Sequence, residues 1–108
     1  MPKYMTLFKY TAEGAKGLLK DKAAGRVAAL KQAAESAGGR VESVNFVSGG
    51  EYTGVIVSEY PDFETFMAFM TRVQATGAVE DGRTFRLLSP EEMDRGLAKN
   101  MTYRAPGA

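Results

Sequence analysis

Residues 3–10, near the start of the chain, read Lys-Tyr-Met-Thr-Leu-Phe-Lys-Tyr and are the most informative segment for the fold. Its aromatic side chains are typical of a β-strand. Side chains alternate along a strand, so one face carries Tyr4, Thr6, Phe8 and Tyr10. The other face carries Met5 and Leu7. Because neither face is polar, we expect both to be covered, one by helices and the other by a second copy of the chain.

The segments that follow this strand alternate between helical and extended patterns. Apolar residues at helical spacing predict a helix that Thr11 caps, that becomes regular from Arg26, and that ends at Gly38-Gly39. Residues 40–47 and 51–59 are rich in valine and predict two strands. Glycines in the connection between these strands favour a hairpin.

The second half of the chain repeats the helix and strand pattern. Asp62 is a plausible N-cap for a helix that ends at Gly77, and residues 78–88 predict a strand with a bulge near its start. Ser89-Pro90-Glu91-Glu92 combines a capping box with proline at the first helical position. It predicts a short helix to about Lys99, with Met93 and Leu97 directed inward.

This order of elements, β-α-β-β-α-β with a terminal helix, predicts a ferredoxin-like α+β fold. We expect an antiparallel sheet with the helices on one face. A chain of 108 residues suits one domain. We assign the domain to residues 1–99 and a C-terminal tail to residues 100–108.

Composition limits the chemistry that the chain can perform. The sequence has no Cys and no His, so it offers no thiolate, no imidazole and no usual zinc or haem ligand. Any general acid or base must be Glu, Asp, Lys or Tyr with a shifted pKa. We therefore expect no metal and no cofactor. The net charge of +1 does not favour nucleic-acid binding.

The termini and the apolar runs bear on location. The first residues lack the apolar segment of a signal peptide. No apolar run approaches the roughly 20 residues that a membrane span needs. We therefore expect a cytoplasmic protein without a membrane partner.

Several short motifs, in this order, resemble those of the GYD domain family over residues 1 to about 97. They are Tyr4 to Thr11 with Glu13-Gly14, Gly38-Gly39, Gly50-Glu51-Tyr52, Thr76-Gly77-Ala78-Val79 and Ser89-Pro90-Glu91-Glu92-Met93. The family is named for a Gly-x-Tyr-Asp motif, and Thr53 stands at its Asp position here. The resemblance implies a dimeric α+β barrel, in which the sheets of two copies face each other, and it implies no catalytic residues.

Two groups of residues are candidates for a ligand site. Thr6, Phe8 and Tyr10 could line a cavity between two subunits, or form a plain dimer core. Glu51 and Tyr52 could stand at the mouth of a pocket, whereas the plainer interpretation is that Tyr52 packs against the sheet and Gly50 forms the turn.

The sequence is compatible with three functions. The first is the binding of a small molecule in a cavity at or near the interface of a homodimer. The second is a cofactor-free enzyme, such as an isomerase, cyclase or monooxygenase, for which Glu51 and Glu59 are the first acids to inspect. The third is a structural or assembly protein.

Overall fold

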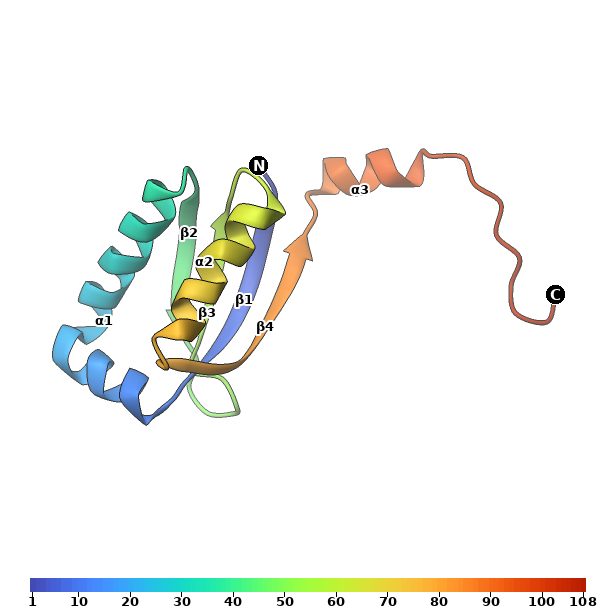
Figure 1. The fold of residues 1–108 in the computed structure, drawn as a ribbon. Helices are drawn as coiled ribbons and strands as arrows, with labels where there is room; N and C mark the ends of the chain where they lie inside the picture. Colours follow the sequence, from blue (N-terminus) through green and yellow to red (C-terminus); the bar gives the residue numbers. More distant parts are fainter.

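A computed structural model describes all of residues 1–108 and shows the predicted ferredoxin-like α+β fold (Figure 1). The elements in chain order are β1 (Lys3–Tyr10), α1 (Ala12–Ser36), β2 (Arg40–Phe46), β3 (Gly54–Glu59), α2 (Phe63–Ala75), β4 (Val79–Leu87) and α3 (Pro90–Leu97). The predicted order is confirmed, and β1 has the predicted bounds. The hairpin strand β3 begins three residues later than expected, because residues 47–53 form a longer loop.

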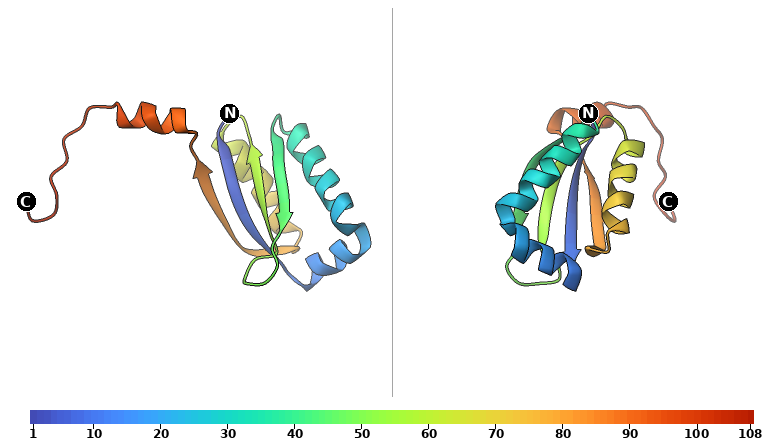
Figure 2. Two further views of the ribbon diagram at one scale, coloured as in Figure 1. Left: turned by 180° about the vertical axis from the view of Figure 1, so that it is seen from behind. Right: turned by 60° about the vertical axis from the view of Figure 1, so that its left-hand side comes forward.

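The four strands form one antiparallel sheet in the order β2-β3-β1-β4. Strand β1 therefore lies inside the sheet, paired with β3 on one side and β4 on the other. Seen from behind, the sheet has α2 beyond it and no helix in front of the strands (Figure 2). One face of the sheet is thus covered by helices, and the other is open.

The core lies between the sheet and the two long helices. The Tyr4 ring stacks on the Phe66 ring of α2, with 4.3 Å between ring centroids. Ala34 of α1, Val41 of β2 and Tyr60 complete the buried cluster. Every β1 side chain of this face up to Phe8 is buried, with Tyr4 only 3% exposed. This face therefore belongs to the interior of one copy.

The assignment of this face to the space between two subunits was wrong. The helices cover the side of Tyr4, Thr6, Phe8 and Tyr10 instead, and leave the other side open. On the open face β1 contributes Met5 and Leu7, which pair with Val57 and Val55 of β3. The expectation that both faces of β1 are apolar holds, but the aromatic residues face the helices because α2 supplies further aromatic rings for them to pack against.

Local signals explain where the helices begin. The Thr11 hydroxyl accepts the Gly14 N–H at 3.2 Å and donates to the Gly77 carbonyl at 2.6 Å, so the start of α1 is tied to the end of α2. A Cβ atom on Gly14 would lie 2.2 Å from the Ala78 carbonyl oxygen. Only glycine permits this approach, and two of the motifs noted in the sequence meet at this contact.

The helix α1 is kinked. Lys22 has a positive φ of 64°, a conformation outside the helix, and divides α1 into two parts. This division agrees with the expectation that the helix becomes regular only from Arg26. The predicted bulge in β4 is also present, because the register with β1 shifts between Leu7 and Lys9, opposite Asp81.

The last part of the chain extends away from the rest of the molecule. In Figures 1 and 2, α3 and the segment after it project beyond the end of β4. The prediction that Met93 and Leu97 point inward was wrong, because no residue of α3 is buried. None of the helices combines the length and the apolar character that crossing a membrane requires.

Candidate functional site

A cavity of about 150 Å³ lies between the helices and the covered face of the sheet. Its floor consists of the β1 side chains Thr6, Phe8 and Tyr10, and its roof of α1 and α2 side chains. Twelve of the twenty lining residues are hydrophobic. The roof is formed by Leu30, Phe66, Phe69, Met70 and Val73. The cavity is therefore mainly apolar and belongs to a single copy of the chain.

A few polar groups enter this apolar space from the sheet. Thr6 and Ser58 are buried, and the Thr6 hydroxyl lies 3.3 Å from the Thr84 hydroxyl. Tyr60 is almost completely buried, and this burial raises the pKa of its hydroxyl to about 12, against a smaller opposing effect of Ser58. Tyr60 thus stays protonated at neutral pH and can donate a hydrogen bond. Few polar groups among apolar walls are typical of small-molecule sites.

The cavity continues into a groove between α1 and α2. Arg26, Leu30, Phe69 and Val73 line both spaces. The groove has small side chains on both walls, including Ala33 of α1 and Ala68 of α2. This groove therefore adjoins the cavity on the side of the two helices.

A cationic side chain stands where the cavity and the groove meet. Arg26 lines both and pairs with Asp21 at 3.5 Å. Asp21 and Arg26 flank the kink at Lys22, so the ion pair links the two parts of α1. The guanidinium is about one-third exposed, which leaves it accessible to an anionic group of a ligand.

The structure separates the five predicted site residues into two groups. Thr6, Phe8 and Tyr10 line the cavity. Glu51 and Tyr52 line an adjoining polar surface hollow together with Lys9 and Arg83, and this hollow shares Asp81 and Gly82 with the cavity. The two groups therefore line different but neighbouring hollows, and only the first lies in an apolar enclosure.

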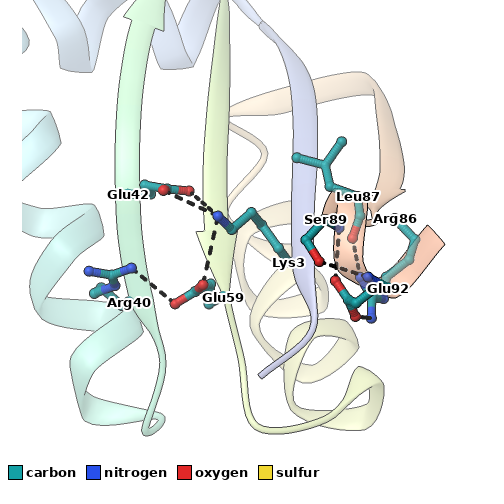
Figure 3. Close-up of polar contacts among 8 residues, drawn as sticks. All are labelled: Lys3, Arg40, Glu42, Glu59, Arg86, Leu87, Ser89 and Glu92. Atoms are coloured by element: carbon teal, nitrogen blue, oxygen red, sulfur yellow. Dashed lines mark hydrogen bonds and ion pairs between the residues drawn. The ribbon is translucent and has the colours of Figure 1, made fainter. Parts of the chain in front are cut away.

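The two acids named for an enzyme have different surroundings. Glu51 is exposed in the loop before β3. Glu59 is only 19% exposed and forms ion pairs with Arg40 at 3.2 Å and Lys3 at 3.9 Å (Figure 3). Its carboxylate lies opposite Lys3 on the open face of the sheet, away from the cavity.

Sequence reasoning missed Ser58, Tyr60 and Arg26. Alternation along β3 could have found the first two, because Ile56, Ser58 and Tyr60 follow one another on the same side of the strand. No local pattern marks Arg26, because its position beside the cavity depends on how α1 packs.

The loop before β3 is anchored by the residue that departs from the family motif. The Thr53 hydroxyl accepts the Tyr10 N–H at 3.0 Å, and the Thr53 N–H donates to the Phe8 carbonyl at 2.8 Å. An aspartate carboxylate can accept the same bond from Tyr10. Threonine therefore preserves the connection between this loop and β1.

Comparisons with known proteins agree with this geometry. A family model described as the GYD domain matches residues 4–97. No curated protein matches the chain. Among solved structures, FFRP-DM1 is similar with a TM-score of 0.57 and 15% identity, over 82% of this chain and 100% of its own.

Two further structures have the same fold. TTHA0845 from Thermus thermophilus has a TM-score of 0.52 and 21% identity, over 82% of this chain and 95% of its own. The hypothetical protein PHS023 from Pyrococcus horikoshii has a TM-score of 0.53 and 15% identity, over 82% and 92%. At these identities the likeness shows the fold alone. The family match covers most of the chain, and the chain therefore belongs to the GYD domain family.

Proposed function

We propose that this protein binds a small, mainly apolar molecule in the cavity between its helices and its sheet. The observation that carries the proposal is the cavity itself, about 150 Å³ of mainly apolar space, whose polar lining consists of hydroxyl groups together with Arg26, Gln74, Glu80 and Asp81. A cavity of roughly that volume accommodates one benzene-sized ring. The ligand class is thus a single ring or a short branched chain.

Arg26 adds a preference for a negatively charged group. It stands where the groove enters the cavity, and its only ion pair is the one with Asp21. A carboxylate on the ligand can form a charge-assisted hydrogen bond with the guanidinium while the apolar part lies deeper. Small aromatic or branched aliphatic carboxylic acids are therefore the first compounds to test.

The proposal also includes pairing of two copies through their open sheet faces. The residues at the centre of this face are apolar, namely Met5, Leu7, Val55, Val57 and Phe85. Phe85 is 44% exposed in a single copy. An apolar patch at the centre of a sheet face that no helix covers is typical of an interface. Two identical faces can meet in an isologous dimer.

Binding fits the observations better than proton transfer does. Glu59 is engaged by Arg40 and Lys3, and Glu51 lies outside the cavity. The buried ionisable group at the cavity, Tyr60, has a pKa raised to about 12, which makes it a weak acid and a hydrogen-bond donor. We therefore place the enzyme alternative second.

A thermal-shift screen tests the ligand. We expect at least one small carboxylic acid to raise the melting temperature. At a concentration 100 times its dissociation constant, a ligand stabilises the folded state by about 2.7 kcal/mol. The matched uncharged amide should bind more weakly. If no acid in a panel of single-ring and branched compounds stabilises the protein, the proposal is wrong.

A matched pair of variants locates the binding site. Val73→Trp fills the cavity from α2, whereas Leu19→Trp adds the same ring at an exposed position of α1. We expect Val73→Trp to abolish binding in calorimetry and Leu19→Trp to leave it unchanged. Circular dichroism confirms that both variants are folded. Equal binding by both variants would exclude this cavity as the site.

Sedimentation velocity tests the pairing of sheets. Val57→Lys places a charge at the centre of the open face, and we expect the dimer to dissociate at least about tenfold more readily. Thr71→Lys, on the exposed side of α2, is the control. An unmodified chain that sediments as a monomer would contradict sheet pairing.

A further inference from the structure

The segment of residues 88–108, which we call the arm, carries large apolar side chains that its own domain does not cover. Leu97 is 69% exposed and Tyr103 is 80% exposed. Leu88, Met93 and Met101 are also exposed. Figures 1 and 2 show that the arm leaves the end of β4 and runs away from the sheet and helices. Exposed apolar groups in this number mark an interaction surface.

The helix in the arm has a well-defined start. The Ser89 hydroxyl accepts the Glu92 N–H at 3.0 Å, and the Glu92 carboxylate accepts the Ser89 N–H at 2.9 Å. Met93 and Leu97 lie four residues apart and therefore share one face of α3. A helix of eight residues is nevertheless marginal in water without tertiary packing. The apolar face of α3 needs a surface to cover it.

The joint between β4 and α3 directs the arm away from its own domain. Only Leu88 and Ser89 separate the two elements, and Ser89 is engaged in the cap. The Arg86 guanidinium pairs with Glu92 at 3.3 Å and also donates to the Leu87 carbonyl (Figure 3). Folding α3 back onto its own domain would disrupt the Arg86–Glu92 pair. This arrangement favours a covering surface on another molecule.

A groove of suitable character lies between α2 and β4. Its walls include Tyr4, Phe63, Met67 and Met70, and both Phe63 and Met67 are exposed. Arg86 also lines this groove, and none of its nine lining residues is acidic. The first turns of α3 carry Glu91, Glu92 and Asp94. An apolar groove without acidic residues thus complements an apolar helix face with acidic neighbours, of which Glu91 and Asp94 form no ion pair within their own chain.

We propose that the groove between α2 and β4 of one copy binds the arm of a second copy, and that the second copy receives the arm of the first in the same way. A stable interface buries about 800 Å² per partner. The open sheet face offers mainly half-buried side chains, so the exchanged arms supply the additional apolar area. Reciprocal exchange satisfies two-fold symmetry. This exchange of arms adds to the proposed pairing of sheets, and separate variants test the arm and the sheet face.

Cross-linking tests which molecule the arm contacts. The natural chain has no Cys, so single cysteines can be placed without background. We expect a mixture of the Leu97→Cys chain and the Met67→Cys chain to form a covalent dimer with a short bismaleimide. A mixture of Leu97→Cys with Leu19→Cys, an exposed position on α1, should not. Absence of the first adduct overturns the proposal.

A substitution tests whether the contact stabilises the dimer. Leu97→Glu places a charge on the apolar face of α3, whereas Arg95→Glu changes charge on the opposite face. Because α3 is not buried in its own domain, neither variant should unfold the protein. We expect Leu97→Glu to weaken association at least about tenfold, and Arg95→Glu to change it less than about twofold.

Unchanged association of Leu97→Glu overturns the exchange of arms even if the cross-link forms. Failure of the sheet pairing would be seen separately, as unchanged association of the Val57→Lys variant. Ligand binding in the cavity is measured separately by calorimetry. The three proposals can therefore fail independently.

Discussion

The two faces of the sheet both carry mainly apolar side chains from β1, but their surroundings differ. On one face, Tyr4, Thr6 and Phe8 of β1 are buried beneath α1 and α2. On the other, Met5 and Leu7 remain half-exposed between strands that no helix covers. The covered face contains a cavity, whereas the open face has an apolar centre with polar residues such as Arg83, Ser43 and Asn45 beside it. One strand can therefore contribute alternate residues to the protein core and the remaining residues to a surface available for association with a second copy.

The largest expected difference in the free energy of unfolding comes from removing one phenylalanine ring from each face of the sheet. Phe66→Ala removes the ring that stacks on Tyr4 and should lower the free energy of unfolding by about 3–5 kcal/mol. Phe85→Ala, on the open face, should cost about 1 kcal/mol in a dissociated copy, because the ring is only partly buried. Urea denaturation at low protein concentration measures both. Equal losses would contradict the distinction between the faces.

Stability measured as a function of pH should report on Tyr60, a residue of the covered face. The pKa of Tyr60 rises from its ordinary value of 10.0 to about 12 in the folded state. The neutral hydroxyl is therefore favoured by folding, and its contribution is complete below pH 10 and is lost as the pH rises from 10 towards 12. The loss is on the order of 2 kcal/mol.

The control for this titration is Tyr60→Phe, which has no group to ionise at that position. We expect the urea midpoint of the unmodified protein to fall more steeply above pH 10 than that of the variant. Parallel curves would show that Tyr60 does not carry the effect.

Two helix N-caps, Thr11 in the domain and Ser89 in the arm, allow the stability of these two regions to be compared. Thr11→Ala removes the cap of α1 and the bond to the Gly77 carbonyl, and should cost about 1–2 kcal/mol. Ser89→Ala removes the cap of α3 and should change the unfolding of the domain by less than about 0.5 kcal/mol. Both values come from urea midpoints. A large loss for Ser89→Ala would show that the arm stabilises its own domain.

The smallest effect is expected at the edge of the open face. Lys3 pairs with Glu42 at 3.0 Å and with Glu59 at 3.9 Å (Figure 3). These side chains are partly exposed, so Lys3→Gln should cost less than about 1 kcal/mol. High salt should reduce the difference from the unmodified protein. A difference that persists in high salt would mean that these charges lie in a drier environment than the structure shows.

The comparison of the faces also explains how much could be predicted from the sequence. The order of elements, the bounds of β1 and the caps at Thr11, Asp62 and Ser89 followed from local patterns. Local patterns suffice there because capping and alternation depend on neighbours in the chain. The choice of the covered face depends on which helix residues approach the sheet, and no local pattern contains that information.

The candidate site was only partly predictable for the same reason. Thr6, Phe8 and Tyr10 were identified because one strand places them on one face. Glu51 and Tyr52 were grouped with them through their position in a motif, whereas the loop that carries them ends beside Lys9 and Arg83. Arg26 joins the cavity only through the packing of α1 against α2, and residues distant in sequence determine that packing.

The interior position of β1 also has a consequence for how the protein is made. This strand is synthesised before its neighbours β3 and β4, which begin only at Gly54 and Val79. Long-range pairings of this kind form late. A growing chain therefore exposes an aromatic strand with two unpaired edges until most of the protein has left the ribosome, and such edges invite aggregation. Chains cut short before Val79 should accumulate in inclusion bodies rather than fold.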